Sequence, residues 1–377
     1  MSMPSDPTSS PGADLVSDAN GTGRADAMGT WISAPTDAAV DLADAPAAVS
    51  YSLEGQADIE GRSLFRLAIH QLRKDKGAMV GLVIVAFVVL CAVFAPVICA
   101  ILGVDPYKLY ASTVNPNLAG IPLFGPKILS NYPSGITAAH PFGVEPGIGR
   151  DVLARIVYGA RVSLIFALVA TAISVVLGTV VGVVAGFFGG AVDAVLAFVM
   201  DVLLAFPFLL FIIAVTPVLR NQPFLEAHLG TNGNGGRVSI LILIVGFFGF
   251  PYFGRIIRGQ VYSLREKEFI DAAKVVGAST RHILFRQMLP NLAASIIVYS
   301  ALVIPTNVVL EATLSYLGVG VDPPTPSWGR MLNDAVAWYQ VTPTFLLIPG
   351  IALFITVLGF NLFGDGLRDV LDPRTTG

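Results

Sequence analysis

Long stretches without a single charged residue constrain this chain more than any other feature. Five of them reach or approach the length of a spanning helix, because about 20 apolar residues cross the hydrocarbon core of a bilayer. A sixth stretch is interrupted by Asp201 and Pro207. The sequence therefore predicts an all-α membrane protein with six spans, at residues 78–102, 162–186, 193–217, 237–256, 292–316 and 343–365.

The composition agrees with a membrane protein. Hydrophobic residues make up 54% of the chain and charged residues only 13%, whereas a soluble protein carries about 25% charge. A chain with so few charges cannot cover its surface with them, so most of that surface must meet lipid or protein. This excludes a nucleic-acid-binding protein built on a basic face.

Charge is unevenly distributed along the chain. Residues 1–60 hold ten acidic residues and one basic residue, against a net charge of −3 for the whole chain. This segment consists largely of Ser, Asp, Ala, Pro and Gly, and it has too few large apolar side chains to offset the entropy lost on ordering. We therefore expect residues 1–60 to form a disordered acidic tail.

Lysine and arginine predict the orientation of the chain. With the N-terminus inside, the cytoplasmic segments hold 15 of these residues and the outer segments hold 8, as the positive-inside rule requires. Both termini are then cytoplasmic. The expected plan is an acidic tail at 1–60, a basic flank and first span at 61–102, an extracytoplasmic loop at 103–160 ending in a short interfacial helix (Gly149–Arg161), a transmembrane core at 161–371, and a cytoplasmic tail at 372–377.

The cytoplasmic loop at residues 256–290 is the most informative part of the chain. Its first part, Gln260–Val276, has apolar residues at helical spacing on one face and charged residues on the other. A helix is therefore predicted there. The residues of its apolar face are Phe269, Ala272, Ala273 and Val276.

The second part of this loop predicts a turn and another helix. Gly277 suits the left-handed conformation that ends a helix, and Ser279 is a favourable N-cap for a helix at Thr280–Met288. The Leu289–Pro290 pair is expected to stop that helix. Such an element either docks on a partner and carries force into the neighbouring spans or only packs beneath its own bundle, and the residues alone leave both readings open.

The same loop resembles the EAA motif of ABC importer permeases. That motif reads Glu-Ala-Ala, three residues, Gly, nine residues, Ile, one residue and Leu-Pro. In this chain Asp replaces the Glu, and Gln287 occupies the Ile position. The matching positions are Asp271, Ala272, Ala273, Gly277, Leu289 and Pro290.

Further segments are similar to the C-type permease subunit of dipeptide, oligopeptide and nickel importers. Together they cover roughly residues 62–374, whereas Gly143–Asp151 departs from the family's pattern and is one residue longer. The matching segments are Tyr158–Leu164, Asp201–Pro207, Arg255–Gln260, Leu314–Gly320, Pro323–Gly329, Phe360–Asp369 and Leu371–Arg374.

The resemblance implies a six-span MetI-like permease bundle in the bacterial inner membrane. The EAA loop would provide the helix that couples to a cytoplasmic ATPase. The expected partners are a B-type permease subunit, two ABC ATPases that bind the ATP and Mg²⁺, an extracytoplasmic solute-binding protein and the lipid bilayer, with no nucleic acid. Dipeptides or oligopeptides are the expected cargo, although nickel importers share these motifs.

We expect this chain not to be an enzyme and to hold no cofactor or metal of its own. It contains no Gly-Lys pair and therefore no P-loop for ATP phosphates. The four histidines are isolated, which gives no zinc-binding spacing. Cys91 and Cys99 lie in one apolar run, about 12 Å apart along a helix, which is too far for a disulfide.

Three polar residues inside predicted spans are candidates for a pathway or for packing. Asp201 and Glu311 are acidic, and Asn307 lies one turn from Glu311. Intramembrane charges are costly and usually have a function, but the sequence leaves both roles open. The same holds for Gly178, Gly182 and Gly186, whose spacing allows close helix contact within the chain or with a second subunit.

Two other functional classes remain as alternatives. An autonomous channel or secondary transporter would need no ATPase, and a membrane scaffold would move no solute. The sequence does not determine the substrate, the partner subunits or the role of the acidic tail.

Overall fold

The structure is a computed structural model that describes residues 72–220 and 234–371, which lie within the unit formed by residues 61–377. The predicted acidic tail (1–60) and C-terminal tail (372–377) lie outside the described residues.

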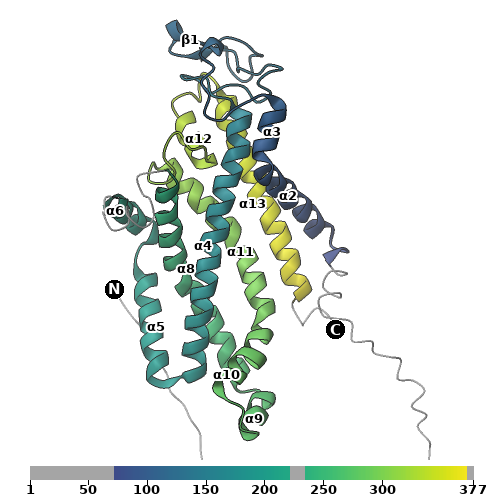
Figure 1. Ribbon diagram of the computed structural model, residues 1–377, viewed down its shortest axis with the longest axis vertical. Coiled ribbons are helices and arrows are strands. Elements are labelled where there is room, and N and C mark those ends of the chain that lie inside the picture. Colours follow the sequence, from purple (N-terminus) through teal and green to yellow (C-terminus); the bar gives the residue numbers. More distant parts are fainter. Residues whose placement is uncertain (1–71, 221–233, 372–377) are drawn as a thin grey trace, which may run out of the picture. The chain divides into compact units, whose positions relative to one another are not determined.

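The described residues are mainly helical (Figure 1). The residues between α3 (Ala95–Leu102) and α4 (Val152–Phe188), which we call the outer segment, contain a short antiparallel hairpin and two 3-10 turns. The hairpin consists of β1 (Val114–Asn115) and β2 (Ile121–Pro122), and the turns lie at Ala111–Thr113 and Pro116–Leu118. The helices are α2 (Lys76–Val93), α3 (Ala95–Leu102), α4 (Val152–Phe188), α5 (Gly190–Ala205), α6 (Phe208–Arg220), α8 (Asn234–Arg265), α9 (Glu268–Val275), α10 (Thr280–His282), a π-helical turn (Ile283–Met288), α11 (Leu289–Tyr316), α12 (Trp328–Ala335) and α13 (Pro343–Leu371).

Five of the described helices are long and apolar enough to cross a membrane: α2, α4, α8, the continuous unit from α10 to α11, and α13. The pair α5 and α6 meets the same criterion when it is counted together, but the two helices are bent by 85°. The all-α, membrane-spanning prediction is confirmed, and the predicted third span is divided. Phe206 adopts an extended conformation at the break because the following Pro207 disfavours the helical one.

The predicted interfacial helix at Gly149–Arg161 is not a separate element. Asp151 caps α4 by accepting a hydrogen bond from Ala154 N at 2.6 Å, and the helix then continues without a break to Phe188. Gly159 lies inside this helix, and its missing side chain leaves room for the Trp328 ring, which would lie 3.2 Å from a Cβ atom there. The expected boundary at residue 160 therefore falls inside α4.

Three of the glycines of α4, namely Gly178, Gly182 and Gly186, pack against α8 within the chain. A methyl group added at Gly178 would lie 2.9 Å from Gly254 N, and one at Gly182 would lie 2.5 Å from Gly254 O. At Gly186 it would lie 2.8 Å from the Cβ atom of Val261. The backbones of α4 and α8 therefore touch, which places these two helices side by side (Figure 1).

Replacing Gly182 should separate these two helices. We expect Gly182→Val to lower stability by about 1–3 kcal/mol, since the added atoms overpack a backbone contact. The matched control is Gly259→Ala on α8, where a Cβ atom would meet nothing within 4 Å. Thermal unfolding of the purified chain in detergent checks both variants, and equal midpoints for the two would contradict the contact.

Candidate functional site

The segment between α8 and α11, residues 266–288, forms an elbow at the opposite end of the described unit from the outer segment (Figure 1). The predicted helix at Gln260–Val276 is divided here. Its first residues belong to α8, Lys267 is extended, and α9 begins at Glu268. The change of direction carries Ile270 into the protein interior, where it is fully buried with Ile283 and Met288.

Gly277 ends α9 as the sequence predicts. Its φ angle is +81°, in the left-handed region that glycine tolerates best. Gly277 N donates to Lys274 O at 3.0 Å and Ala278 N donates to Ala273 O at 2.9 Å, which is the hydrogen-bond pattern of a Schellman motif. Ser279 then caps the next helix by accepting from His282 N at 3.4 Å. The turn between α9 and α10 is thus locally defined.

The predicted stop at Leu289–Pro290 is wrong. The helix passes from α10 through the π-helical turn directly into α11. In that turn Leu289 N donates to Leu284 O, five residues back, so the hydrogen-bond register changes just before Pro290. Pro290, which has no N–H, then occupies the first turn after the change, where a missing donor is tolerated. The second arm of the elbow is therefore continuous with a membrane-spanning helix.

Most of the apolar surface of the elbow is exposed. Ile270 is the buried residue of α9, whereas Phe269 is 42% exposed and Val276 is 87% exposed. Ala272 is exposed and Ala273 is half-buried. Val275 and Phe285 extend the same exposed surface. Within α9, packing beneath the bundle therefore accounts for Ile270 and in part for Ala273, and leaves the other apolar side chains uncovered.

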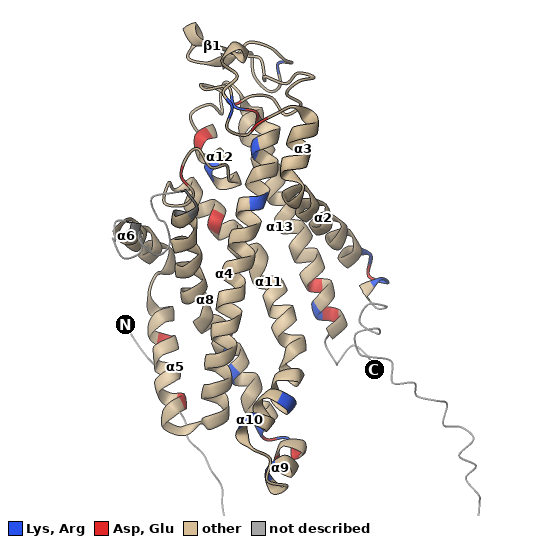
Figure 2. Cartoon of the chain, in the orientation of Figure 1, with Lys and Arg blue, Asp and Glu red and all other residues tan. Residues whose placement is uncertain are grey.

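Charged residues border this apolar surface. Asp271 is exposed and pairs with Lys274 at 2.8 Å on the next turn of α9. Figure 2 shows charged residues at the elbow and near the outer segment, with few charged residues along the helices between them. Because the elbow pair is solvent-exposed, it contributes little to stability.

A partly buried clamp joins α8 to the corner between α4 and α5. Arg258 donates two hydrogen bonds to Asp193, at 2.5 and 2.8 Å, and Tyr262 donates a third to the same carboxylate. Arg265 donates to Gly186 O at 3.2 Å, near the C-terminal end of α4. We call Asp193, Arg258, Tyr262 and Arg265 the clamp. The clamp was not predicted from the sequence, although opposite charges at the ends of the third and fourth predicted spans could have indicated it.

Asp201 also pairs with an arginine of α8, but this pair is exposed. Asp201 lies 3.1 Å from Arg255, and both side chains are more than half exposed. Arg255 borders a groove of about 580 Å³ between α8 and α11. Polar side chains line much of this groove, namely Gln260, Ser263, Asn291, Ser295 and Tyr299.

Asn307 and Glu311 are buried between α4 and α11, away from this groove. Asn307 donates to the Thr171 hydroxyl at 2.8 Å. Glu311 is 1% exposed and accepts hydrogen bonds from Ser163 at 2.5 Å and Ser315 at 2.7 Å. These contacts hold α4 and α11 together, so the three candidate polar residues do not form one site.

A second polar cluster, also missed from the sequence, lies beneath the outer segment. Arg150 donates two hydrogen bonds to Glu145, at 2.7 and 2.8 Å, and Arg155 of α4 is 1% exposed beside them. Asp334 of α12 pairs with Arg330 at 2.8 Å and lies 3.7 Å from Arg155. Burial raises the pKa of the Asp334 carboxyl, and Arg330 opposes part of that rise. The cluster joins the outer segment to α4 and α12.

Two protein families match the chain. The family described as binding-protein-dependent transport system inner membrane component matches residues 178–377, and the N-terminal TM domain of oligopeptide transport permease C matches residues 63–120.

Individual relatives are similar over most of the chain. The dipeptide transport system permease protein DppC of Alkalihalophilus pseudofirmus is 38% identical over 312 residues, which is 83% of this chain and 90% of the relative. The glutathione transport system permease protein GsiD of Shigella flexneri serotype 5b is 41% identical over 247 residues, or 66% of this chain and 76% of the relative. An inward-facing structure of the MetNI methionine ABC transporter has a TM-score of 0.45 at 20% identity, covering 57% of this chain and 96% of that one.

The two aspartates of α5 provide a matched test of the clamp. We expect Asp193→Ala to cost more than about 1 kcal/mol, because it leaves the partly buried Arg258 without its carboxylate. Asp201→Ala should cost less than that, since its exposed pair contributes only about 0–1 kcal/mol. Thermal midpoints of the two purified variants decide the matter, and an equal or larger loss for Asp201→Ala would refute the clamp.

Proposed function

The chain belongs to the family of binding-protein-dependent transport system inner membrane components, and on this premise we propose that it is the C-type permease subunit of an ATP-driven importer of dipeptides or oligopeptides. The relatives named above are permeases for dipeptides and for glutathione, which are short peptides. The match to the oligopeptide permease domain at residues 63–120 supports the same cargo class.

The exposed apolar surface of the elbow carries the proposal for coupling. Phe269, Val276 and Phe285 are exposed while Ile270 fixes α9 to the interior. A rigid element that leaves large apolar side chains uncovered is suited to a protein partner. We assign this surface, together with Asp271, Ala272, Ala273 and Gly277, to docking in a groove of a cytoplasmic ABC ATPase. ATP and Mg²⁺ would bind to that partner.

The connections of the elbow suggest how movement reaches the spans. One arm follows α8, which the clamp holds to the α4–α5 corner through Arg258 and Arg265. The other arm continues without a break into α11, whose first residues are Leu289 and Pro290. A displacement of α9 by the ATPase would therefore act on α4, α5 and α8 as one body and on α11 directly.

The groove between α8 and α11 is the part of the chain best suited to a peptide path near the elbow. Its neutral amide and hydroxyl groups can bond peptide amides of any sequence. Arg255 and Asp201, exposed at its edge, match the carboxylate and ammonium ends of a zwitterionic peptide. Asn307 and Glu311 are buried, and we assign them to packing.

The proposed assembly follows from this assignment. The elbow and both termini would lie in the cytoplasm, and the outer segment would face the solute-binding protein outside the inner membrane. A B-type permease subunit would complete the pathway. The 15 to 8 bias of lysine and arginine supports this orientation.

A charge placed on the elbow should uncouple the transporter. We expect Ala272→Glu to lower ATP-dependent uptake at least tenfold in proteoliposomes that contain the complete importer, because a carboxylate would be desolvated in the apolar contact. The matched control is Ala191→Glu, at an exposed alanine in the first turn of α5, outside both the elbow and the outer segment. Ala272→Glu should insert normally, and uptake equal to that of the control would leave the elbow as a mere connector.

Reconstitution distinguishes the proposed importer from an autonomous transporter. We expect a radiolabelled dipeptide to enter proteoliposomes only when both permeases, the ATPases, the binding protein and ATP are present. The chain alone should move no peptide under a proton or sodium gradient. Uptake by the chain alone would establish the secondary transporter or channel instead, and uptake of nickel but not of dipeptide would overturn the cargo.

A further inference from the structure

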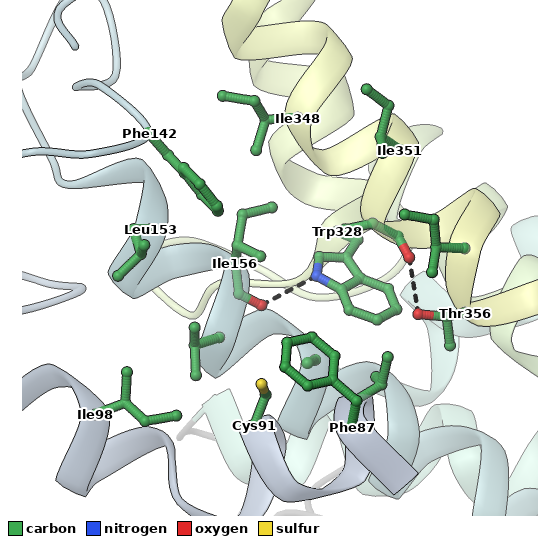
Figure 3. A pocket seen from close by; sticks show the side chains of 15 residues that line it. Phe87, Cys91, Ile98, Phe142, Leu153, Ile156, Trp328, Ile348, Ile351 and Thr356 are labelled. Atoms are coloured by element: carbon green, nitrogen blue, oxygen red, sulfur yellow. Dashed lines mark hydrogen bonds between the residues drawn. The ribbon is translucent and has the colours of Figure 1, made fainter. Parts of the chain in front are cut away.

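A second hollow in the structure has a different chemistry from the groove. It is a cavity of about 450 Å³ between α2, α3, α4 and α13 (Figure 3). Its volume falls within the range of small-molecule sites. Trp328 lies at its inner wall and Phe142 of the outer segment borders it (Figure 3).

The cavity offers no free polar group to a hydrophilic ligand. Apolar side chains line it except at Cys91, Thr356 and Trp328. The Thr356 hydroxyl donates to Ala352 O at 2.7 Å, and the Trp328 indole N–H donates to Ile156 O at 3.0 Å (Figure 3). The Cys91 thiol is only a weak hydrogen-bonding group. A peptide or a phosphate group in this cavity would lose its hydrogen bonds to water without replacement.

The cavity opens through side chains of membrane-spanning helices. Phe87 of α2 is 65% exposed, and Ile351 and Ile355 of α13 are 52% and 40% exposed. Because α2 and α13 are spanning helices, these exposed residues meet the hydrocarbon of the bilayer. The inner wall is closed, since Val88 is 8% and Trp328 is 2% exposed. The cavity is thus open toward the exposed faces of α2 and α13 and closed at Val88 and Trp328.

The border formed by Phe142 is held in place. Its neighbour Gly143 accepts a hydrogen bond from Val152 N at 3.1 Å, at the start of α4. His140 contacts the Asp151 carboxylate at 2.7 Å, and both side chains are buried. These contacts fix the outer segment over this end of the cavity.

We propose that this cavity holds one acyl chain of a bilayer phospholipid. In a bilayer, lipid acyl chains are the apolar molecules next to the opening between α2 and α13. A helix of a partner subunit is about 10–12 Å wide and does not fit a cavity of this size between packed helices. A lipid chain there would fill the contact between α2, α4 and α13, next to Trp328.

Photo-crosslinking tests the site without relying on transport. The full chain, expressed with its partner subunits, is kept in its native membranes, which are doped with phosphatidylglycerol carrying a diazirine in the middle of one acyl chain. After irradiation, adducts are mapped by mass spectrometry. We expect them on Val88 and Trp328, which bulk lipid cannot reach, as well as on the exposed Phe87.

Variants make the result decisive. Ala352→Phe fills the cavity and should reduce adducts on Val88 and Trp328 at least tenfold while labelling of Phe87 persists. Ala172→Phe, on an exposed part of α4 outside the cavity lining, should change nothing. If Ala352→Phe does not give a monodisperse protein, Ala352→Leu takes its place. Three results would each overturn the proposal. The first is labelling of Phe87 without labelling of Val88 and Trp328, and the second is labelling of Val88 and Trp328 that the Ala352 variant does not reduce. The third is a crosslink from Val88 or Trp328 to a partner subunit.

Discussion

The backbone contact between α4 and α8 is the interaction on which the rest of the structure depends. Inside a bilayer the hydrophobic effect does not drive helices together, so association relies on close packing. Gly178, Gly182 and Gly186 let the two backbones touch and so fix their register. That register brings Arg258 opposite Asp193 and Arg265 opposite the C-terminal end of α4.

The remaining elements are joined to this pair by polar contacts at different levels. The clamp adds α5 at the elbow end, and the Ser163–Glu311 hydrogen bond adds α11 farther along α4. Beneath the outer segment, Arg155 of α4 lies beside Glu145 and Asp334. These contacts are buried or partly buried, where an unpaired partner would be costly, so each fixes its helix in one place.

The groove and the cavity differ in chemistry, and each suits a different environment. The groove by the elbow carries amide, hydroxyl and charged groups that suit a hydrated solute. The cavity beside Trp328 has no free polar partner and opens toward hydrocarbon. A permease needs both kinds of surface, because its path must replace water around the cargo while its outside must be solvated by lipid.

The sequence by itself determined the helical, membrane-spanning architecture, the turn at Gly277 and the motif of the elbow, because these follow from local composition and from backbone preferences of single residues. It could not determine the ends of α8 and α9, the continuity of α10 with α11 or the direction of the apolar elbow face. Those depend on where Ile270 is buried and on a hydrogen-bond register that changes over several residues. Only the tertiary structure decided that Asp193 and not Asp201 is clamped, that Asn307 and Glu311 are buried, and that Arg155 joins a polar cluster. The physical reason is that each outcome depends on a partner more than 50 residues away in the chain or on another helix.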